Sequence, residues 1–186
     1  MLERGRATFI ATGGKTPEAV YDILARADAP WDKVTVTLTD ERWVDPHGPE
    51  SNERLVRERL FTERAALATF VPLKSAHATP RDAIADAETR LKPILPAAVV
   101  LLGMGEDGHV ASLFPGGPLD AAGLAVAAQG GQSRLSLTLH ALEPRRLTVL
   151  LISGEAKRRT LEDRSGLPVH VLLARTKAPV RVLWWA

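Results

Sequence analysis

Short apolar runs alternate along this chain with longer segments of helical period, and this alternation limits the possible folds more than any other feature. The runs occupy residues 7–11, 34–39, 98–102, 135–139, 147–152, 169–174 and 180–185. Several are apolar at consecutive positions, such as Val99-Val100-Leu101-Leu102, which is typical of strands buried on both faces of a sheet. The pattern therefore predicts an α/β fold with a mostly parallel sheet and helices on both of its faces.

Helix starts are marked by residues that lie between these runs. Thr16-Pro17 and Thr79-Pro80 each supply an N-cap residue and a proline suited to the first helical position. Apolar residues at helical spacing follow both pairs, and shorter helices are predicted after Ser51 and Ser153. The first apolar stripe consists of Ala19, Val20, Ile23, Leu24 and Ala27. Residues 116–133, rich in Gly, Ala and Gln, are predicted to form a surface excursion rather than a linker.

Length and composition predict one domain that spans residues 1–186. The 24 Lys and Arg against 22 Asp and Glu give a net charge of +2, without the clustered positive charge that nucleic acids or anionic membranes require. The chain has no Cys, which excludes disulfides, thiolate zinc sites and a Cys nucleophile. No run approaches the ~18 apolar residues of a membrane span, and no apolar stretch follows the charged residues 1–6. We therefore expect a cytoplasmic protein without a signal peptide.

The loops that follow strands are the expected ligand-binding segments, because ligands of parallel sheets bind beyond the carboxyl ends of the strands. The first such loop is Thr12-Gly13-Gly14-Lys15-Thr16. Two glycines let the backbone approach a ligand closely, and the helix that follows offers free N–H groups. The loop predicts a phosphate cradle made by Thr12, Gly13, Gly14 and Thr16, although a plain strand-to-helix turn is the alternative.

A second loop, Asp40-Glu41-Arg42-Trp43-Val44, follows the apolar run at 34–39. Two carboxylates and a guanidinium at the carboxyl end of a strand can hold the hydroxyls of a sugar and its developing charge. An internally paired surface turn would have the same composition, so the two readings stay open.

The third loop runs Gly103-Met104-Gly105-Glu106-Asp107-Gly108-His109 and formally matches the G-x-G-x-x-G pattern of dinucleotide-binding folds. Its position in the middle of the chain and the nearby Pro115 argue against that reading. The loop instead offers His109, which suits proton transfer, beside Asp107, a carboxylate that can fix the tautomer of an imidazole. Two ligands at this spacing, with no obvious third, make a poor metal site.

The other histidines and the last tryptophans are assigned structural roles. His170 is expected to be a hydrogen-bonded core residue within the apolar run 169–174, and His47, His77 and His140 are expected in loops or on the surface. Trp184-Trp185 is expected to pack in the core on the last strand.

Taken together, these loops resemble the motifs of the 6-phosphogluconolactonases. The string from Gly103 to Gly116, GMGEDGHVASLFPG, looks very like the family signature. The first loop resembles the family's Ser-Gly-Gly-x-Thr-Pro loop, with Thr12 in place of Ser, and the second loop with Ser51-Asn52 resembles its second motif. Arg134 and Lys157 match its basic positions. The resemblance implies the modified Rossmann-like sheet of the sugar-phosphate isomerase/deaminase superfamily, in a chain lacking the helix that usually precedes the first strand.

The resemblance also implies an activity, the hydrolysis of 6-phosphoglucono-1,5-lactone to 6-phosphogluconate in the oxidative pentose phosphate pathway, with no cofactor and no metal. His109 would be the general base, Asp107 would orient it or contact the sugar, and Arg42 would stabilise the oxyanion or the sugar. The residues implied to bind substrate are Thr12, Gly13, Gly14, Thr16, Asp40, Asn52, Arg134 and Lys157. The expected partner is a small phosphosugar lactone, with neither nucleic acid nor membrane, and the oligomeric state is not legible from the sequence.

Two alternatives of different kinds compete with this reading. Glucosamine-6-phosphate deaminases of the same superfamily carry a Glu five residues after the His and lack the Arg of the second motif, whereas this chain has Phe114 and Arg42 there. A non-catalytic sugar-phosphate-sensing domain usually accompanies a helix-turn-helix segment, for which the 186 residues leave no spare length. Such a domain would also have no need of a titratable residue at position 109. These differences favour the lactonase over both alternatives.

Overall fold

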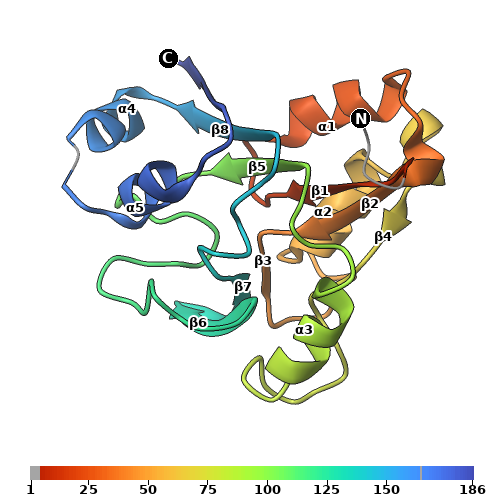
Figure 1. The fold of residues 1–186 in the computed structure, drawn as a ribbon, viewed down its shortest axis with the longest axis horizontal. Coiled ribbons are helices and arrows are strands. Elements are labelled where there is room, and N and C mark those ends of the chain that lie inside the picture. Colours follow the sequence, from red (N-terminus) through yellow and green to blue (C-terminus); the bar gives the residue numbers. More distant parts are fainter. Residues whose placement is uncertain (1–4, 164) are drawn as a thin grey trace.

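A six-stranded parallel sheet lies at the centre of the computed structural model, which describes residues 5–163 and 165–186 (Figure 1). Its strand order is β4-β2-β1-β5-β8-β9, and every neighbouring pair is parallel. The strands are β1 (Ala7–Ala11), β2 (Val34–Leu38), β4 (Thr69–Phe70), β5 (Val99–Gly103), β8 (Leu147–Ser153) and β9 (Val180–Trp185). The predicted α/β class with a mostly parallel sheet is confirmed. The expectations for a signal peptide and a leading helix concern residues 1–4, which lie outside the described residues.

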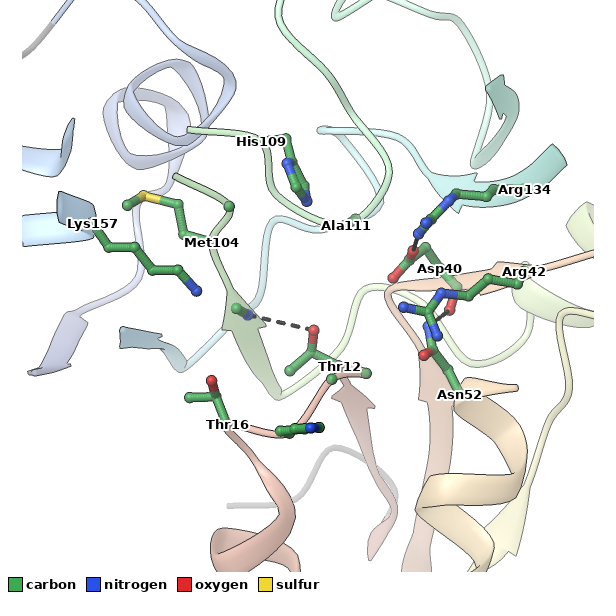
Figure 2. A pocket seen from close by; sticks show the side chains of 15 residues that line it. Thr12, Thr16, Asp40, Arg42, Asn52, Met104, His109, Ala111, Arg134 and Lys157 are labelled. Carbon is green, nitrogen blue, oxygen red and sulfur yellow. Dashed lines mark hydrogen bonds and ion pairs between the residues drawn. The ribbon is translucent and has the colours of Figure 1, made fainter. Parts of the chain in front are cut away.

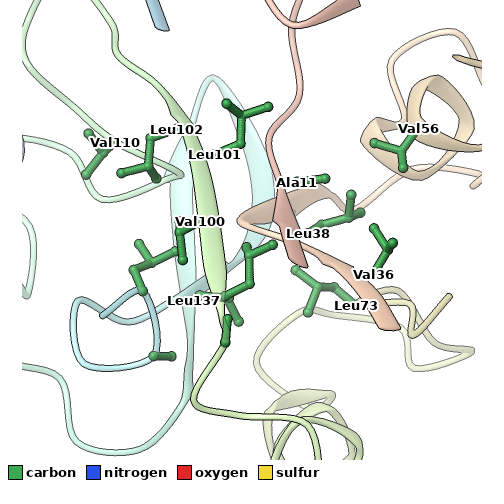
Figure 3. Packing of buried hydrophobic residues seen from close by; sticks show 14 of the residues in the cluster. Ala11, Val36, Leu38, Val56, Leu73, Val100, Leu101, Leu102, Val110 and Leu137 are labelled. Atoms are coloured by element: carbon green, nitrogen blue, oxygen red, sulfur yellow. The ribbon is translucent and has the colours of Figure 1, made fainter. Parts of the chain in front are cut away.

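The core combines buried apolar side chains of the central strands with side chains from the helices and loops packed against them. Val36 and Leu38 of β2 and Val100 and Leu102 of β5 are fully buried, and Figure 3 shows part of this cluster. Burying one such side chain contributes roughly 1.5–3 kcal/mol to folding. The consecutive apolar positions of these strands therefore produce a sheet rigid enough to hold loops at its edge.

In the described part of the chain, five α-helices accompany the sheet: α1 (Glu18–Arg26), α2 (Asn52–Arg59), α3 (Ile84–Leu91), α4 (Glu155–Glu162) and α5 (Pro168–Arg175). The first four confirm the helices predicted after Thr16-Pro17, Ser51, Thr79-Pro80 and Ser153. The N-cap of α3 is Ala83 and not Thr79, so Thr79-Pro80 precedes this helix without starting it. The short 3₁₀ helices η2 (Trp31–Lys33) and η3 (Glu63–Leu67) lie in the connections. In Figure 1, α1 and α2 lie on the side of β1 and β2, whereas α4 and α5 lie on the side of β8.

Two details of α1 differ from the prediction. Pro17, not Thr16, is the N-cap, and no side chain caps this helix. The buried residues of α1 are Tyr21 and Ala25, whereas Ile23 is 70% exposed. The Tyr21 hydroxyl donates to the backbone oxygen of Thr12 at 2.5 Å, and burial raises the pKa of this phenol. The apolar stripe did not predict this packing, because Tyr21 carries a polar hydroxyl and can be buried only where that hydroxyl has a hydrogen-bond partner.

Residues 169–174, predicted as a strand, belong to helix α5 instead. Val169 and Leu172 are buried three residues apart, which is one face of a helix, and Pro168 occupies the first turn. His170 is therefore a helical residue and only half-buried. As predicted, it is hydrogen-bonded: its Nδ1 accepts from the Leu167 amide at 3.2 Å, so its Nε2 donates to the Leu161 oxygen at 3.1 Å.

A second, three-stranded antiparallel sheet was not predicted. Its order is β3 (Asp40–Arg42), β7 (Gln132–Leu137) and β6 (Ala125–Gly130). The predicted strand at 135–139 thus overlaps β7. Residues 116–133, predicted as a surface excursion, lie at the surface with only Ala125 buried, but they contain β6 and the start of β7, which were not predicted. Gly131, with φ +76°, turns the chain between these two strands. The hairpin brings Arg134 opposite Arg42 of β3.

The prediction that Trp184 and Trp185 pack in the core is wrong. Their side chains are 40% and 43% exposed, since β9 is an edge strand with no strand beyond it in the described part of the chain. Trp184 Nε1 donates to the Gly154 oxygen at 3.1 Å, and the Arg158 guanidinium lies 5.2 Å from the ring centroid. The apolar composition of this strand reflects contacts at an edge rather than burial.

Candidate active site

The carboxyl ends of the parallel strands meet at one edge of the sheet, and a cleft of about 290 Å³ opens there (Figure 2). The loop after β1, strand β3 after β2, the loop after β5 and helix α4 after β8 all contribute to it. Ten of the eleven residues predicted for the site line this cleft. They are Thr12, Gly13, Gly14, Thr16, Asp40, Arg42, Asn52, His109, Arg134 and Lys157. The eleventh, Asp107, contacts His109 directly.

Five further residues line the cleft that were not predicted as site residues. They are Lys15, Gly103, Met104, Gly105 and Ala111. Lys15 had a readable signal, because it is a cation inside a loop already predicted to bind phosphate. Ala111 had none, since its positive φ of +52° becomes apparent only in three dimensions.

His109 and Asp107 form a close pair. His109 Nδ1 lies 2.6 Å from Asp107 Oδ1, and the His109 amide donates to the same oxygen at 3.2 Å. Partial burial raises the pKa of the Asp107 carboxyl, but the hydrogen bonds from His109 and its charge outweigh this and hold that pKa below its usual range. An ionised Asp107 places the imidazole proton on Nδ1, which leaves Nε2 as the basic atom. The His109 side chain is 30% exposed and lines the cleft.

Two glycines give the loop of His109 its shape. A Cβ on Gly105 would lie 2.2 Å from ring atoms of His109, so the ring occupies the space that a side chain would need. Gly108 has φ +80°, and a Cβ there would lie 2.6 Å from Leu167. The glycines that resemble a dinucleotide fingerprint therefore make room for an imidazole and for the chain before α5.

Arg42 and Arg134 are directly opposite each other in the antiparallel pair of β3 and β7. Arg42 Nη1 donates to the backbone oxygen of Glu50 at 2.6 Å, and Arg134 Nη1 lies 3.6 Å from Asp40 Oδ2. The Nε atoms of both arginines are buried without a hydrogen-bond partner among the described residues. Like charges in register destabilise a sheet, and an unsatisfied buried donor costs about 1–3 kcal/mol. An anionic, oxygen-rich ligand would relieve both penalties.

Asp40 connects three parts of the cleft wall. Its Oδ1 accepts from Thr39 Oγ1 at 2.9 Å, and its Oδ2 accepts from Ser112 Oγ at 2.5 Å. Together with the nearby Arg134, these contacts join β3 to the loop of His109 and to β7. Asp40 thus lines the cleft, although both of its carboxylate oxygens already accept hydrogen bonds from the protein.

Asn52, the first residue of α2, reaches back across the loop after β1. Its Nδ2 donates to the backbone oxygen of Asp40 at 2.9 Å, whereas its Oδ1 is buried and has no partner in the described ranges. A Cβ on Gly13 would lie 1.9 Å from that Oδ1, so only glycine permits this contact. Gly13 is therefore required for packing against Asn52, and Gly14, with φ +91°, for the turn itself.

Thr12 holds the ends of strands together at the floor of the cleft. The Gly103 amide donates to Thr12 Oγ1 at 3.4 Å, and Thr39 Oγ1, whose proton goes to Asp40, lies 3.4 Å from the same atom. In Figure 2, Lys157 and Thr16 lie on one side of the cleft in this view and the two arginines on the other. His109 lies between them.

Glu41 does not reach the cleft, although the second loop suggested that both of its carboxylates could hold a sugar. Its side chain is buried against the start of α2. Within residues 5–163 and 165–186 no group of three or more His, Asp or Glu could hold a metal ion. No helix in those ranges is long and apolar enough to cross a membrane.

Comparison with known proteins identifies the family of this chain. Residues 1–184 match the family model described as glucosamine-6-phosphate isomerases/6-phosphogluconolactonase. The chain is 45% identical to a 6-phosphogluconolactonase of Caulobacter vibrioides, over 99% of this chain and 85% of that protein. It is 39% identical to one of Rhizobium meliloti, over 97% and 85%.

Solved structures show the same fold. A 6-phosphogluconolactonase from Shewanella baltica superposes with a TM-score of 0.88 at 35% identity, covering 98% of this chain and 85% of that one. A monomeric glucosamine-6-phosphate deaminase superposes with a TM-score of 0.82 at 18% identity, covering 96% and 85%, and shows the fold alone. From the match along nearly its whole length, the chain belongs to the family of glucosamine-6-phosphate isomerases and 6-phosphogluconolactonases.

Proposed function

We propose that this chain hydrolyses 6-phosphoglucono-1,5-lactone to 6-phosphogluconate. The observation that carries the proposal is the combination within one cleft of the paired His109 and Asp107 with four cations, Lys15, Arg42, Arg134 and Lys157. The first pair suits activation of water, and the cations suit a substrate with a dianionic phosphate. The relatives named 6-phosphogluconolactonase support the same assignment.

His109 acts as the general base in this proposal. Its Nε2 takes a proton from water as the water oxygen attacks the lactone carbonyl, and it returns the proton to the ring oxygen as that oxygen leaves. Asp107 accepts from Nδ1 and stabilises the imidazolium that forms in between. A positioned base of this kind contributes roughly 10²–10⁴-fold to the rate.

Arg42 stabilises the oxyanion or the bound sugar, since a cationic donor placed where negative charge develops lowers the barrier. Asp40 and Asn52 are proposed to face the sugar, and the unpartnered Oδ1 of Asn52 is an acceptor for a sugar hydroxyl. An ester carbonyl is already electrophilic, so the proposed route uses neither a metal nor a cofactor.

The phosphate is proposed to bind where the loop after β1 faces the cations. The Gly13 and Gly14 amides, the Thr16 hydroxyl and the side chains of Arg134 and Lys157 are its donors. Binding through this remote group holds the reacting carbon against His109 and turns binding energy into orientation.

The direct test is a lactonase assay on freshly prepared 6-phosphogluconolactone, with spontaneous hydrolysis subtracted. His109→Ala is expected to lower kcat by roughly 10²-fold or more with little change in KM. Near wild-type turnover in this variant would contradict the role of His109. Ammonia release from glucosamine 6-phosphate serves as the control, since it would identify a deaminase instead. Phe114, where the deaminases were expected to carry a carboxylate, packs on the His109 ring at a centroid distance of 4.7 Å.

A further inference from the structure

One buried carboxylate, Glu41, has no part in the proposed chemistry. Its side chain is 1% exposed, and it lies between Asp40 and Arg42, which both line the cleft. Successive side chains of a strand point to opposite faces, so Glu41 of β3 points away from the cleft and toward α2. A charge buried in this way needs dedicated partners.

Each oxygen of Glu41 accepts two hydrogen bonds. Oε1 accepts from the amides of Arg42 and Asn52, both at 2.8 Å. Oε2 accepts from the Ser51 hydroxyl at 3.0 Å and from the Glu53 amide at 2.7 Å. Burial raises the pKa of this carboxyl above its usual range, and the four hydrogen bonds offset only part of that rise.

Three of these donors, the Ser51 hydroxyl and the Asn52 and Glu53 amides, belong to the start of α2, where backbone amides have no partner within the helix and the helix dipole is positive. The Glu41 carboxylate therefore joins β3 to the start of α2. The joined residues include Asn52, whose own side chain donates to the Asp40 oxygen at 2.9 Å and meets Gly13. They also include Arg42, whose guanidinium donates to the Glu50 oxygen just before α2.

We propose that Glu41 is a positioning residue of the lactonase site, whose carboxylate fixes β3 against the first turn of α2 and so holds Arg42 and Asn52 at the substrate. The inference rests on the proposed function, because it assigns the two held residues to substrate. The competing explanation is that Glu41 only stabilises the fold as a helix cap.

The variant Glu41→Gln separates these explanations. Glutamine keeps the shape but replaces one acceptor oxygen with an NH₂ group, which then faces two donors whichever way the amide turns. We expect kcat/KM at 25 °C to fall by about tenfold or more, because small displacements of substrate-contacting groups are costly. The matched control is Val56→Ala, a fully buried residue of α2 that does not line the cleft. It should lower Tm while kcat/KM stays within about twofold of wild type.

A double variant tests whether Glu41 acts through Asn52. If it does, adding Glu41→Gln to Asn52→Ala lowers kcat/KM by less than the product of the two single losses. A multiplicative loss would overturn the proposal. The proposal would also be overturned if kcat/KM of the Glu41→Gln variant were as high as that of Val56→Ala. If Glu41→Gln does not fold, Glu41→Asp, which retains the charge but shortens the side chain, replaces it in the same comparison.

A measurement that needs no turnover separates failure of this inference from failure of the proposed function. Hydrogen exchange of the Arg42 and Asn52 amides should become faster in Glu41→Gln and remain slow in Val56→Ala. Wild-type protein without lactonase turnover would refute the proposed function, and exchange would still decide whether Glu41 holds these two residues. Unchanged protection at both amides would overturn the inference even in an active enzyme.

Discussion

Replacing Gly105 with alanine tests whether the orientation of the His109 ring controls turnover. A Cβ at position 105 would lie 2.2 Å from Cε1 and Nδ1 of His109 and 2.6 Å from Oδ1 of Asp107. Ordinary van der Waals contact begins at 3.4 Å, so the ring has to move by roughly 1.2 Å. The ring is the free end of its side chain and can yield without unfolding the loop, but its movement breaks the hydrogen bond from Nδ1 to Asp107.

The expected cost follows from that displacement. Misplacement of a reacting group by about 1 Å can cost about 10²-fold in rate, which corresponds to about 2.7 kcal/mol of activation free energy. We therefore expect kcat for 6-phosphogluconolactone to fall by about this factor. KM should change little, because none of the atoms that the new Cβ would meet belongs to the proposed phosphate donors. Initial rates corrected for spontaneous hydrolysis, with Tm as a check on folding, provide the assay.

Gly103→Ala provides the comparison within the same loop. A Cβ there would meet its nearest neighbour, Thr12 Oγ1, at 3.8 Å, which is an ordinary contact. This variant should lose far less turnover than Gly105→Ala. Equal kcat in the two folded variants, or a Gly105→Ala protein that keeps more than about a third of wild-type kcat, would refute the reasoning.

Three further predictions concern the substrate phosphate, the tautomer of His109 and the pH dependence of stability. Arg134→Ala and Lys157→Ala should each raise KM by about tenfold with a smaller change in kcat, because they are proposed to hold a group remote from the carbonyl; unchanged KM in both would contradict that placement. Asp107→Asn should lower kcat by disturbing the tautomer of His109. Because the hydrogen bonds and charge of His109 lower the pKa of Asp107 in the folded protein, the stabilising effect of this carboxylate should be present above its unfolded pKa and be lost as pH falls through the folded pKa. Denaturant unfolding of wild type and Asp107→Asn between about pH 3 and pH 6 checks this, and a stability difference that vanishes above about pH 5 would contradict it.

The residues of the cleft could be identified from the sequence because a parallel sheet gathers the carboxyl ends of its strands. Thr12 and His109 are far apart in the chain, yet both follow apolar runs that form neighbouring strands, β1 and β5. Short apolar runs therefore sufficed to predict that their loops would meet. Loop composition then identified the groups with useful chemistry.

The second sheet could not be predicted in this way, because β3 and β6, unlike the apolar end of β7, depend on pairing rather than on their own composition. Residues 125–130 read Ala-Val-Ala-Ala-Gln-Gly, with one β-branched residue, and form β6 because β7 lies beside them. Helix α5 was missed for the converse reason, since Val-His-Val-Leu-Leu-Ala has the apolar density of a buried strand. Short apolar runs are ambiguous until tertiary packing selects one period.

The different fates of Asp40, Glu41 and Arg42 show which additional rule would have corrected the site. These residues were treated as a loop, so both carboxylates were free to face a sugar. They form strand β3, in which alternate side chains point to opposite faces. Two-residue alternation places Asp40 and Arg42 on the cleft side and turns Glu41 toward α2, where Ser51 and its neighbours supply the donors. A charged tripeptide after a buried strand thus divides into two residues for the ligand and one for the scaffold, and a strand only three residues long is enough to impose that division.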